Sequence, residues 1–137
     1  ITESLSSLAG LAINRSENLT NESMTPDQFK YGLSHTSASG DIRTNYIMTY
    51  TADSPRLPGI ADRSGNITPA LYVPSGFTHD IFLSLSLGEN FDLKVGIRNI
   101  TNEKYWDWTS VAGLPEGGAQ QYLNPGTNTS LDLRYNF

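Results

Sequence analysis

The feature that most restricts the fold of this chain is a two-residue alternation of apolar and polar side chains over six segments. Such alternation predicts a β-strand with one apolar face, whereas an amphipathic helix has apolar residues three and four positions apart. The pattern is clearest at 77–87, 91–98 and 129–137, and it is weaker but consistent at 5–13, 29–36 and 42–50. No segment shows the helical spacing convincingly. The sequence therefore predicts an all-β protein of antiparallel strands.

The links between these segments alternate between short and long. The links at 37–41 and 88–90 are short, whereas those at 15–28, 51–76 and 101–128 are long. In an up-and-down sheet alternate links lie at the same end, so all the long loops would project from one end. Outer-membrane β-barrels have this asymmetry, and about 9–11 tilted residues cross a bilayer. We expect about six strands of a transmembrane β-barrel, with a soluble β-sandwich as the alternative.

Composition excludes several other classes of protein. The chain has no cysteine, so a disulfide scaffold or a cysteine-based zinc site is impossible. Its net charge of −5 and pI near 4.8 argue against a nucleic-acid partner. No apolar stretch approaches the roughly 18 residues of a membrane helix, and we expect no signal peptide, because residues 1–4 carry no basic and apolar leader pattern. We expect Ile1 to be a processed terminus or an internal cut. The mean hydropathy of −0.36 suits a barrel as well as a soluble protein, because only every second barrel residue faces lipid.

The chain ends on an aromatic residue within an alternating strand. Leu133, Tyr135 and Phe137 occupy alternate positions, as in the C-terminal strand by which outer-membrane proteins are recognised for barrel assembly. The alternative is that Phe137 is simply an apolar residue on an edge strand, although soluble proteins rarely leave such an edge bare. We interpret these three residues as a barrel-assembly signal.

Two loop motifs resemble those of a known family. Residues 91–108 read F-D-L-K-V-G-I-R-N-I-T-N-E-K-Y-W-D-W, which resembles the penultimate strand and final loop of TonB-dependent outer-membrane receptors, with their signature N-L-[FT]-[DN]-x-x-Y. Residues 122–127 resemble the family's Y-x-x-P-G-R element, except that Thr127 stands where the family usually has arginine. The Y-V-P-S-G-F segment at 72–77 also fits. The Y-W-D-W variant at 105–108 is most similar to the haem and haemoglobin branch.

The resemblance implies a barrel of about 22 strands with a plugged lumen. Since even the smallest common barrel has about 8 strands, residues 1–137 would be a C-terminal segment that lacks the plug. The implied protein is a transporter in the outer membrane of a Gram-negative bacterium. It would import an iron source, with haem or haemoglobin favoured over a siderophore, as cargo and not as cofactor. Its partners would be outer-membrane lipid, the rest of the barrel and plug, the TonB system through the missing part, and the barrel-assembly machinery.

Residues that could contact a ligand are few, and they lie in the predicted long loops. We select four aromatic residues as candidates: Tyr105, Trp106, Trp108 and Tyr122. The alternative for this cluster, which we favour, is an interfacial belt of amphipathic rings where a strand leaves the bilayer. Glu103 and Asp107 flank the cluster and suggest a sugar site with two carboxylates, but the belt explains them better.

Catalytic signatures are poor, so we expect no enzyme, no catalytic residue and no metal site. The sequence has no phosphate loop, no HExxH and no G-x-S-x-G motif. His35 and His79 are the only neutral-pH bases, and both fall on the alternating apolar faces. We interpret them as interfacial or lipid-facing residues. A soluble carbohydrate-binding module remains the competing class, and a glycosidase would require Glu103 or Asp107 to be essential.

Overall fold

The computed structural model describes residues 3–13, 25–54, 60–69, 71–111, 114–115 and 118–137. Six long strands dominate it: β1 (Ser4–Ala12), β2 (Gln28–Thr36), β3 (Ile42–Thr51), β6 (Gly76–Leu87), β7 (Phe91–Arg98) and β8 (Asn128–Tyr135). They form one antiparallel sheet in chain order, β1-β2-β3-β6-β7-β8. The prediction of an all-β chain with six up-and-down strands is confirmed, and each boundary lies within about two residues of the expected one.

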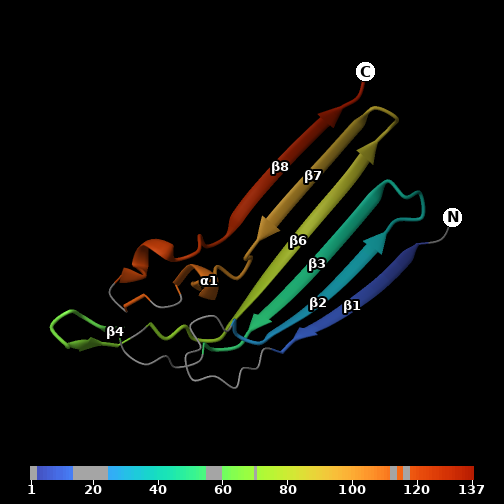
Figure 1. Ribbon diagram of the computed structural model, residues 1–137. Helices are drawn as coiled ribbons and strands as arrows, with labels where there is room; N and C mark the ends of the chain where they lie inside the picture. Colours follow the sequence, from blue (N-terminus) through green and yellow to red (C-terminus); the bar gives the residue numbers. More distant parts are fainter. Residues whose placement is uncertain (1–2, 14–24, 55–59, 70, 112–113, 116–117) are drawn as a thin grey trace.

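The ends of the sheet differ as the link lengths predicted. The start of β1, the end of β8 and the two short turns lie at one end, and the described parts of the long loops lie at the other (Figure 1). Each short turn contains a glycine with positive φ, Gly40 at 85° and Gly88 at 72°. This conformation strains residues that carry a Cβ, which is why these turns use glycine. The sheet is open within the described residues, with β1 and β8 at its edges.

One face of the sheet is apolar across all six strands. Directly paired residues of antiparallel strands point to the same side, and the register aligns Leu5, His35, Thr44, Leu83, Val95 and Leu131 in one such row. The rows on either side of it continue the same face. Every apolar set recognised by alternation therefore meets its neighbours in register. A slip of one residue at any pairing would have turned that strand's apolar side chains to the opposite face.

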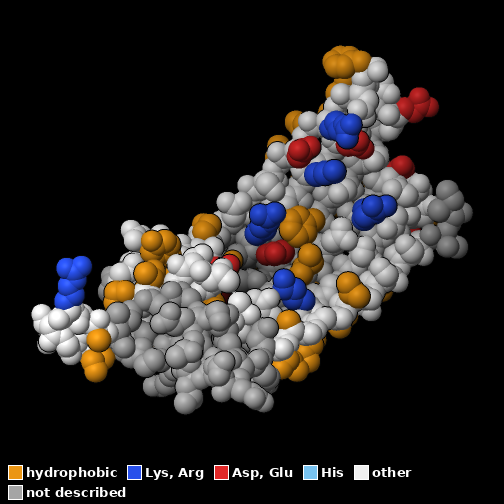
Figure 2. Space-filling model, viewed as in Figure 1, with side chains coloured by type: hydrophobic (Ala, Val, Ile, Leu, Met, Phe, Trp, Pro, Cys, Tyr) orange, Lys and Arg blue, Asp and Glu red, His pale blue; other side chains and the backbone are white. Residues whose placement is uncertain are grey.

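The opposite face is polar and carries most of the charge of the strands. Figure 2 shows basic and acidic side chains gathered over it. They come from Lys30, Arg43, Asp80, Asp92, Lys94, Arg98, Asp132 and Arg134. Gly96 lies among them beneath the Phe82 ring, where an added Cβ would lie 3.1 Å from that ring and 2.7 Å from Ser130 Oγ. The Arg98 guanidinium lies 5.9 Å from the centre of the same ring, which is a cation–π distance.

The buried core lies in the loops and not under the sheet. Leu71, Val73, Trp108, Val111 and Ala119 form it, and Gly96 is the only buried residue of the six long strands. The large sheet is thus a single layer in the described part of the chain, and no second sheet packs on it as a sandwich requires.

Several small elements were not expected from the sequence. The long link after β3 contains a two-stranded hairpin, β4 (Ile60–Ala61) and β5 (Ile67–Thr68). The loop after β7 contains the single-turn helix α1 (Trp108–Val111) and the 3₁₀ turn η2 (Gln120–Tyr122). Among the residues that the structure describes, no helix has the length and apolar character to cross a bilayer.

Candidate functional site

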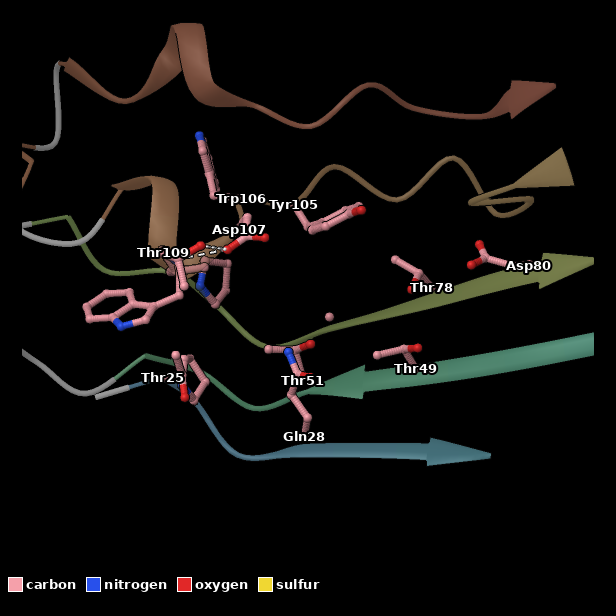
Figure 3. Close-up of a pocket in the computed structure, with 15 residues that line it drawn as sticks. Thr25, Gln28, Thr49, Thr51, Thr78, Asp80, Tyr105, Trp106, Asp107 and Thr109 are labelled. Carbon is pink, nitrogen blue, oxygen red and sulfur yellow. Dashed lines mark hydrogen bonds between the residues drawn. The ribbon is translucent and has the colours of Figure 1, made fainter. Parts of the chain in front are cut away.

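A cavity of about 280 Å³ lies at the long-loop end of the polar face, and we call it the loop-end cavity. Its floor comes from β2, β3 and β6, and its wall from the loop that follows β7 (Figure 3). Its lining residues are Thr25, Pro26, Gln28, Thr49, Thr51, Val73, Pro74, Gly76, Thr78, Asp80, Tyr105, Trp106, Asp107, Trp108 and Thr109.

The strand register assembles the floor of the cavity. Gln28, Thr51 and Gly76 form one cross-strand row, and Thr49 pairs with Thr78 in the next. Apart from Gln28, these polar-face side chains are short, and Gly76 has none, so the sheet leaves space above them. The floor is therefore a surface of hydroxyl and amide groups.

The wall is held by hydrogen bonds within the loop after β7. Trp106 forms a bridge with Leu123, and its Nε1 donates to the Ala119 carbonyl at 2.9 Å. Asp107 precedes α1, and its Oδ1 accepts hydrogen bonds from the backbone N–H of Thr109 at 2.9 Å and from Thr109 Oγ1 at 2.6 Å. A carboxylate at this position caps the exposed N–H groups of a helical turn. The orientations of Trp106 and Asp107 are thus fixed by their own loop.

The loop core anchors the wall to neighbouring segments. Trp108 is only 5% exposed and packs in the core defined above. Val73 exchanges hydrogen bonds with Ser54, whose N–H donates to the Val73 carbonyl at 2.8 Å and whose Oγ accepts from the Val73 N–H at 2.9 Å. The Trp108 Nε1 is buried, and no described residue accepts its hydrogen bond. An unsatisfied buried donor of this kind costs about 1–3 kcal/mol.

The two motifs singled out in the sequence meet beside the cavity. Asn99 is 4% exposed, has a φ of 51°, and exchanges two side-chain hydrogen bonds with the backbone of Glu103. Thr127 donates from Oγ1 to the Asn99 carbonyl at 2.9 Å and from its N–H to Asn102 Oδ1 at 3.2 Å. A Cβ on Gly126 would collide with Asn102. Thr127 therefore contacts this turn in the position where the family usually has arginine.

Tyr105 stands between the loop-end cavity and a neighbouring one. The second cavity, of about 260 Å³, shares Thr78, Asp80 and Tyr105 with the first. Burial raises the pKa of the Tyr105 hydroxyl above its ordinary value of 10.0, and the carboxylates of Asp80 and Asp107 raise it further, while Arg98 lowers it. The hydroxyl therefore stays protonated at neutral pH and can donate a hydrogen bond.

The structure brings three of the four predicted contact residues together. Tyr105, Trp106 and Trp108 line the cavity, whereas Tyr122 lies in η2, is 43% exposed, and is absent from the lining. The interpretation of Trp108 as an interfacial belt residue is wrong, because the loop core buries it. Glu103 lies close to Gly76, with Oε1 at 3.8 Å from the position of an added Cβ, but it does not line the cavity.

The remaining candidates lie on the apolar face. His35 and His79 are there as predicted, and His79 Nδ1 hydrogen-bonds the Tyr46 hydroxyl at 2.7 Å. Leu133 and Tyr135 are exposed on β8, and the Phe137 ring lies edge-on to Tyr135 with centroids 5.0 Å apart. No group of three or more potential metal ligands occurs in the described segments.

The sequence reasoning missed the floor of the cavity. Thr49, Thr78 and Asp80 were identified only as the polar alternates of their strands, and Thr51 was placed in the long link at 51–76. A signal was present, since these residues fall at the long-loop ends of two strands expected to be neighbours. No family model matches this chain. The likeness to TonB-dependent receptors therefore depends on the two loop motifs quoted above.

Proposed function

We propose that this chain is the C-terminal part of the wall of a TonB-dependent outer-membrane transporter. The observation that carries the proposal is the single-layered sheet with one continuous apolar face. Leu5 and Leu131, on strands at opposite edges, are 73% and 66% exposed. Water would make this face an aggregation surface, whereas lipid solvates it.

The length of the apolar face supports the proposal that the sheet spans a bilayer. On β6 it runs from Phe77 to Leu87. Ten steps of about 3.4 Å, tilted by about 40°, span about 26 Å along the membrane normal. This matches the apolar band of an outer-membrane barrel, which is about 25 Å tall.

Aromatic residues at both ends of the apolar face also support the proposal that this face spans a bilayer. Tyr50 and Phe77 pair at the long-loop end with ring centroids 4.7 Å apart. Tyr135 lies opposite Phe91 at the short-turn end. Rings at these two levels correspond to the aromatic girdles of membrane barrels.

The two sheet edges explain why we propose a part and not a whole barrel. The outer edges of β1 and β8 are unpaired in the described chain, and unpaired backbone groups are not tolerated in lipid. In a closed wall of about 22 strands, β1 would pair with a preceding strand and β8 with the first strand.

The transport mechanism implied by this proposal is not catalytic. Long loops at the outer end capture an iron source, a plug rearranges, and the TonB system supplies energy for release inward. The Y-W-D-W segment favours haem or haemoglobin as cargo. This chain supplies wall, loops and the hydrogen-bonded turn at Asn99, and Phe137 completes the signal for the assembly machinery. The soluble sandwich module is less favoured because it needs a second packed sheet.

The test is growth and fractionation of the source bacterium with the gene intact or deleted. The product should fractionate with the outer membrane, and deletion should abolish growth on haemin or haemoglobin as sole iron source while growth on ferrous salts persists. A ferric siderophore tested in parallel identifies the cargo. A product that remains in the aqueous fraction, without detergent, would disprove the proposal.

A further inference from the structure

The loop-end cavity has a chemical character that iron transport does not explain. Its lining includes five threonines, a glutamine, a tyrosine and two tryptophans, together with the carboxylates of Asp80 and Asp107. No lysine, arginine or histidine is among the lining residues, all of which the structure describes. The cavity therefore offers hydroxyl groups, aromatic surface and two carboxylates, while the neighbouring cations lie outside its lining, with Lys30 in the row of Thr49 and Arg98 in the adjoining cavity.

Both carboxylates keep hydrogen-bonding capacity for a ligand. Asp80 accepts the Asn99 N–H at 2.9 Å through Oδ1, and Asp107 binds Thr109 through Oδ1 as described. These bonds fix the two side chains and leave each Oδ2 available within the described part of the chain. A carboxylate oxygen only accepts, so it selects ligands that carry donors.

One donor complements these acceptors. The Tyr105 side chain lines the same cavity, and its hydroxyl is protonated at neutral pH and can donate a hydrogen bond. A ligand able to donate and accept at several adjacent atoms would satisfy both kinds of group, and aromatic surface suits its less polar edges.

We propose that the loop-end cavity binds a neutral carbohydrate, whose hydroxyl groups donate to Asp80 and Asp107 and accept from Tyr105. The volume of about 280 Å³ is near the lower limit of typical small-molecule sites, about 300 Å³, and suits a small sugar. Haem fits poorly, because its carboxylates would meet Asp80 and Asp107.

The experiment is titration of the full-length protein in detergent with glucose, galactose, mannose and N-acetylglucosamine, each followed by tryptophan fluorescence and calorimetry. At least one sugar should bind saturably with a Kd below about 10 mM. Tyr105→Phe and Asp107→Asn should each weaken that binding about tenfold or more, because the first removes a donor and the second replaces an accepting oxygen with an NH₂ group that cannot accept from a sugar hydroxyl. Asp107→Asn retains an oxygen that can cap Thr109, so the loop should stay folded.

Asp92→Asn is the matched control, since Asp92 lies on the same face at the short-turn end, where its Oδ1 accepts from Ser86 Oγ at 2.8 Å. It should leave sugar affinity unchanged. Failure of all four sugars to saturate, equal weakening by Asp92→Asn, or binding of spermidine in place of sugars would overturn the inference. Haemin uptake is measured separately, so its loss with sugar binding intact counts against the proposed transport alone.

Discussion

A single arginine placed on the apolar face probes what that face contacts. Leu83 lies near the middle of β6, in the row that contains Thr44 and Val95. In the proposed barrel, with the face about 26 Å tall, this row would lie close to the bilayer midplane, where a lipid-facing arginine costs about 2–4 kcal/mol. Leu83→Arg should therefore lower the folding equilibrium constant by about 1.5 to 3 orders of magnitude.

Depth and face provide the controls. Leu87→Arg is on the same face at the short-turn end, and near the interface the cost falls to about 0–1 kcal/mol. Asn45→Arg lies beside Thr44 in sequence but faces the polar side, between Ser34 and Phe82. It should cost less than about 1 kcal/mol, because in the proposed barrel that side would not be exposed to lipid.

The assay is reversible guanidinium unfolding of the full-length protein refolded in lipid vesicles, with the free energy of unfolding compared among the three variants. Equal costs for Leu83→Arg and Leu87→Arg would refute the reasoning, because the environment would then have no depth profile. A cost for Asn45→Arg as large as that for Leu83→Arg would show that both faces lie against comparable surroundings.

Three further outcomes follow from the loops and the C-terminus. Asn99→Ala should destabilise the protein by about 1–2 kcal/mol more than Asn99→Gly in the same unfolding assay, because only glycine accepts the positive φ without strain; equal values would argue against that strain. Hydrogen bonds from Asn66, first its side chain and then its backbone, lower the pKa of Asp62 below its ordinary value of 3.8. A carboxyl group whose pKa is lowered by folding stabilises the folded state above its unfolded-state pKa, and this stabilisation is lost as the pH falls through its folded-state pKa. In an NMR titration, the backbone amide chemical shifts of the β4–β5 hairpin should therefore change below pH 3.8 and stay constant between pH 5 and 8. Deleting Phe137 should reduce the folded protein in outer-membrane fractions by several-fold, whereas Asn136→Ala should not; equal amounts would remove the assembly role.

Much of the sheet could be predicted because strand identity depends on local alternation and link length. In the segments at 77–87 and 91–98 the two-residue alternation can be read from consecutive residues. The three-residue link between them is too short for a parallel connection, so the two segments must form an antiparallel hairpin. The β4–β5 hairpin was missed because two-residue strands are too short to show a period. Its turn is instead stabilised by the Asp62 side chain, which binds the N–H groups of Ser64 and Asn66.

The candidate site was only partly predictable for a different reason. Tyr105, Trp106 and Trp108 lie within four consecutive residues of a predicted long loop, so the local sequence identified them as an aromatic cluster. Their environments differ because the fold buries Trp108 against Val111 and leaves Tyr105 beside a cavity. The threonines of the floor form one surface only because β3 and β6 pair in a particular register. That register depends on pairs of residues far apart in the sequence, so the alternation within each strand does not show it.

The sheet has an even number of long strands, and this affects how a barrel containing it could evolve. Since β1 begins and β8 ends at the short-turn end, the polypeptide enters and leaves this sheet on one side. In the proposed barrel, such a block could be exchanged for a related one without inverting the strands before it. Recombination at its boundaries would then keep the long loops at the outer end, so new outer loops could be acquired while the other strands kept their orientation.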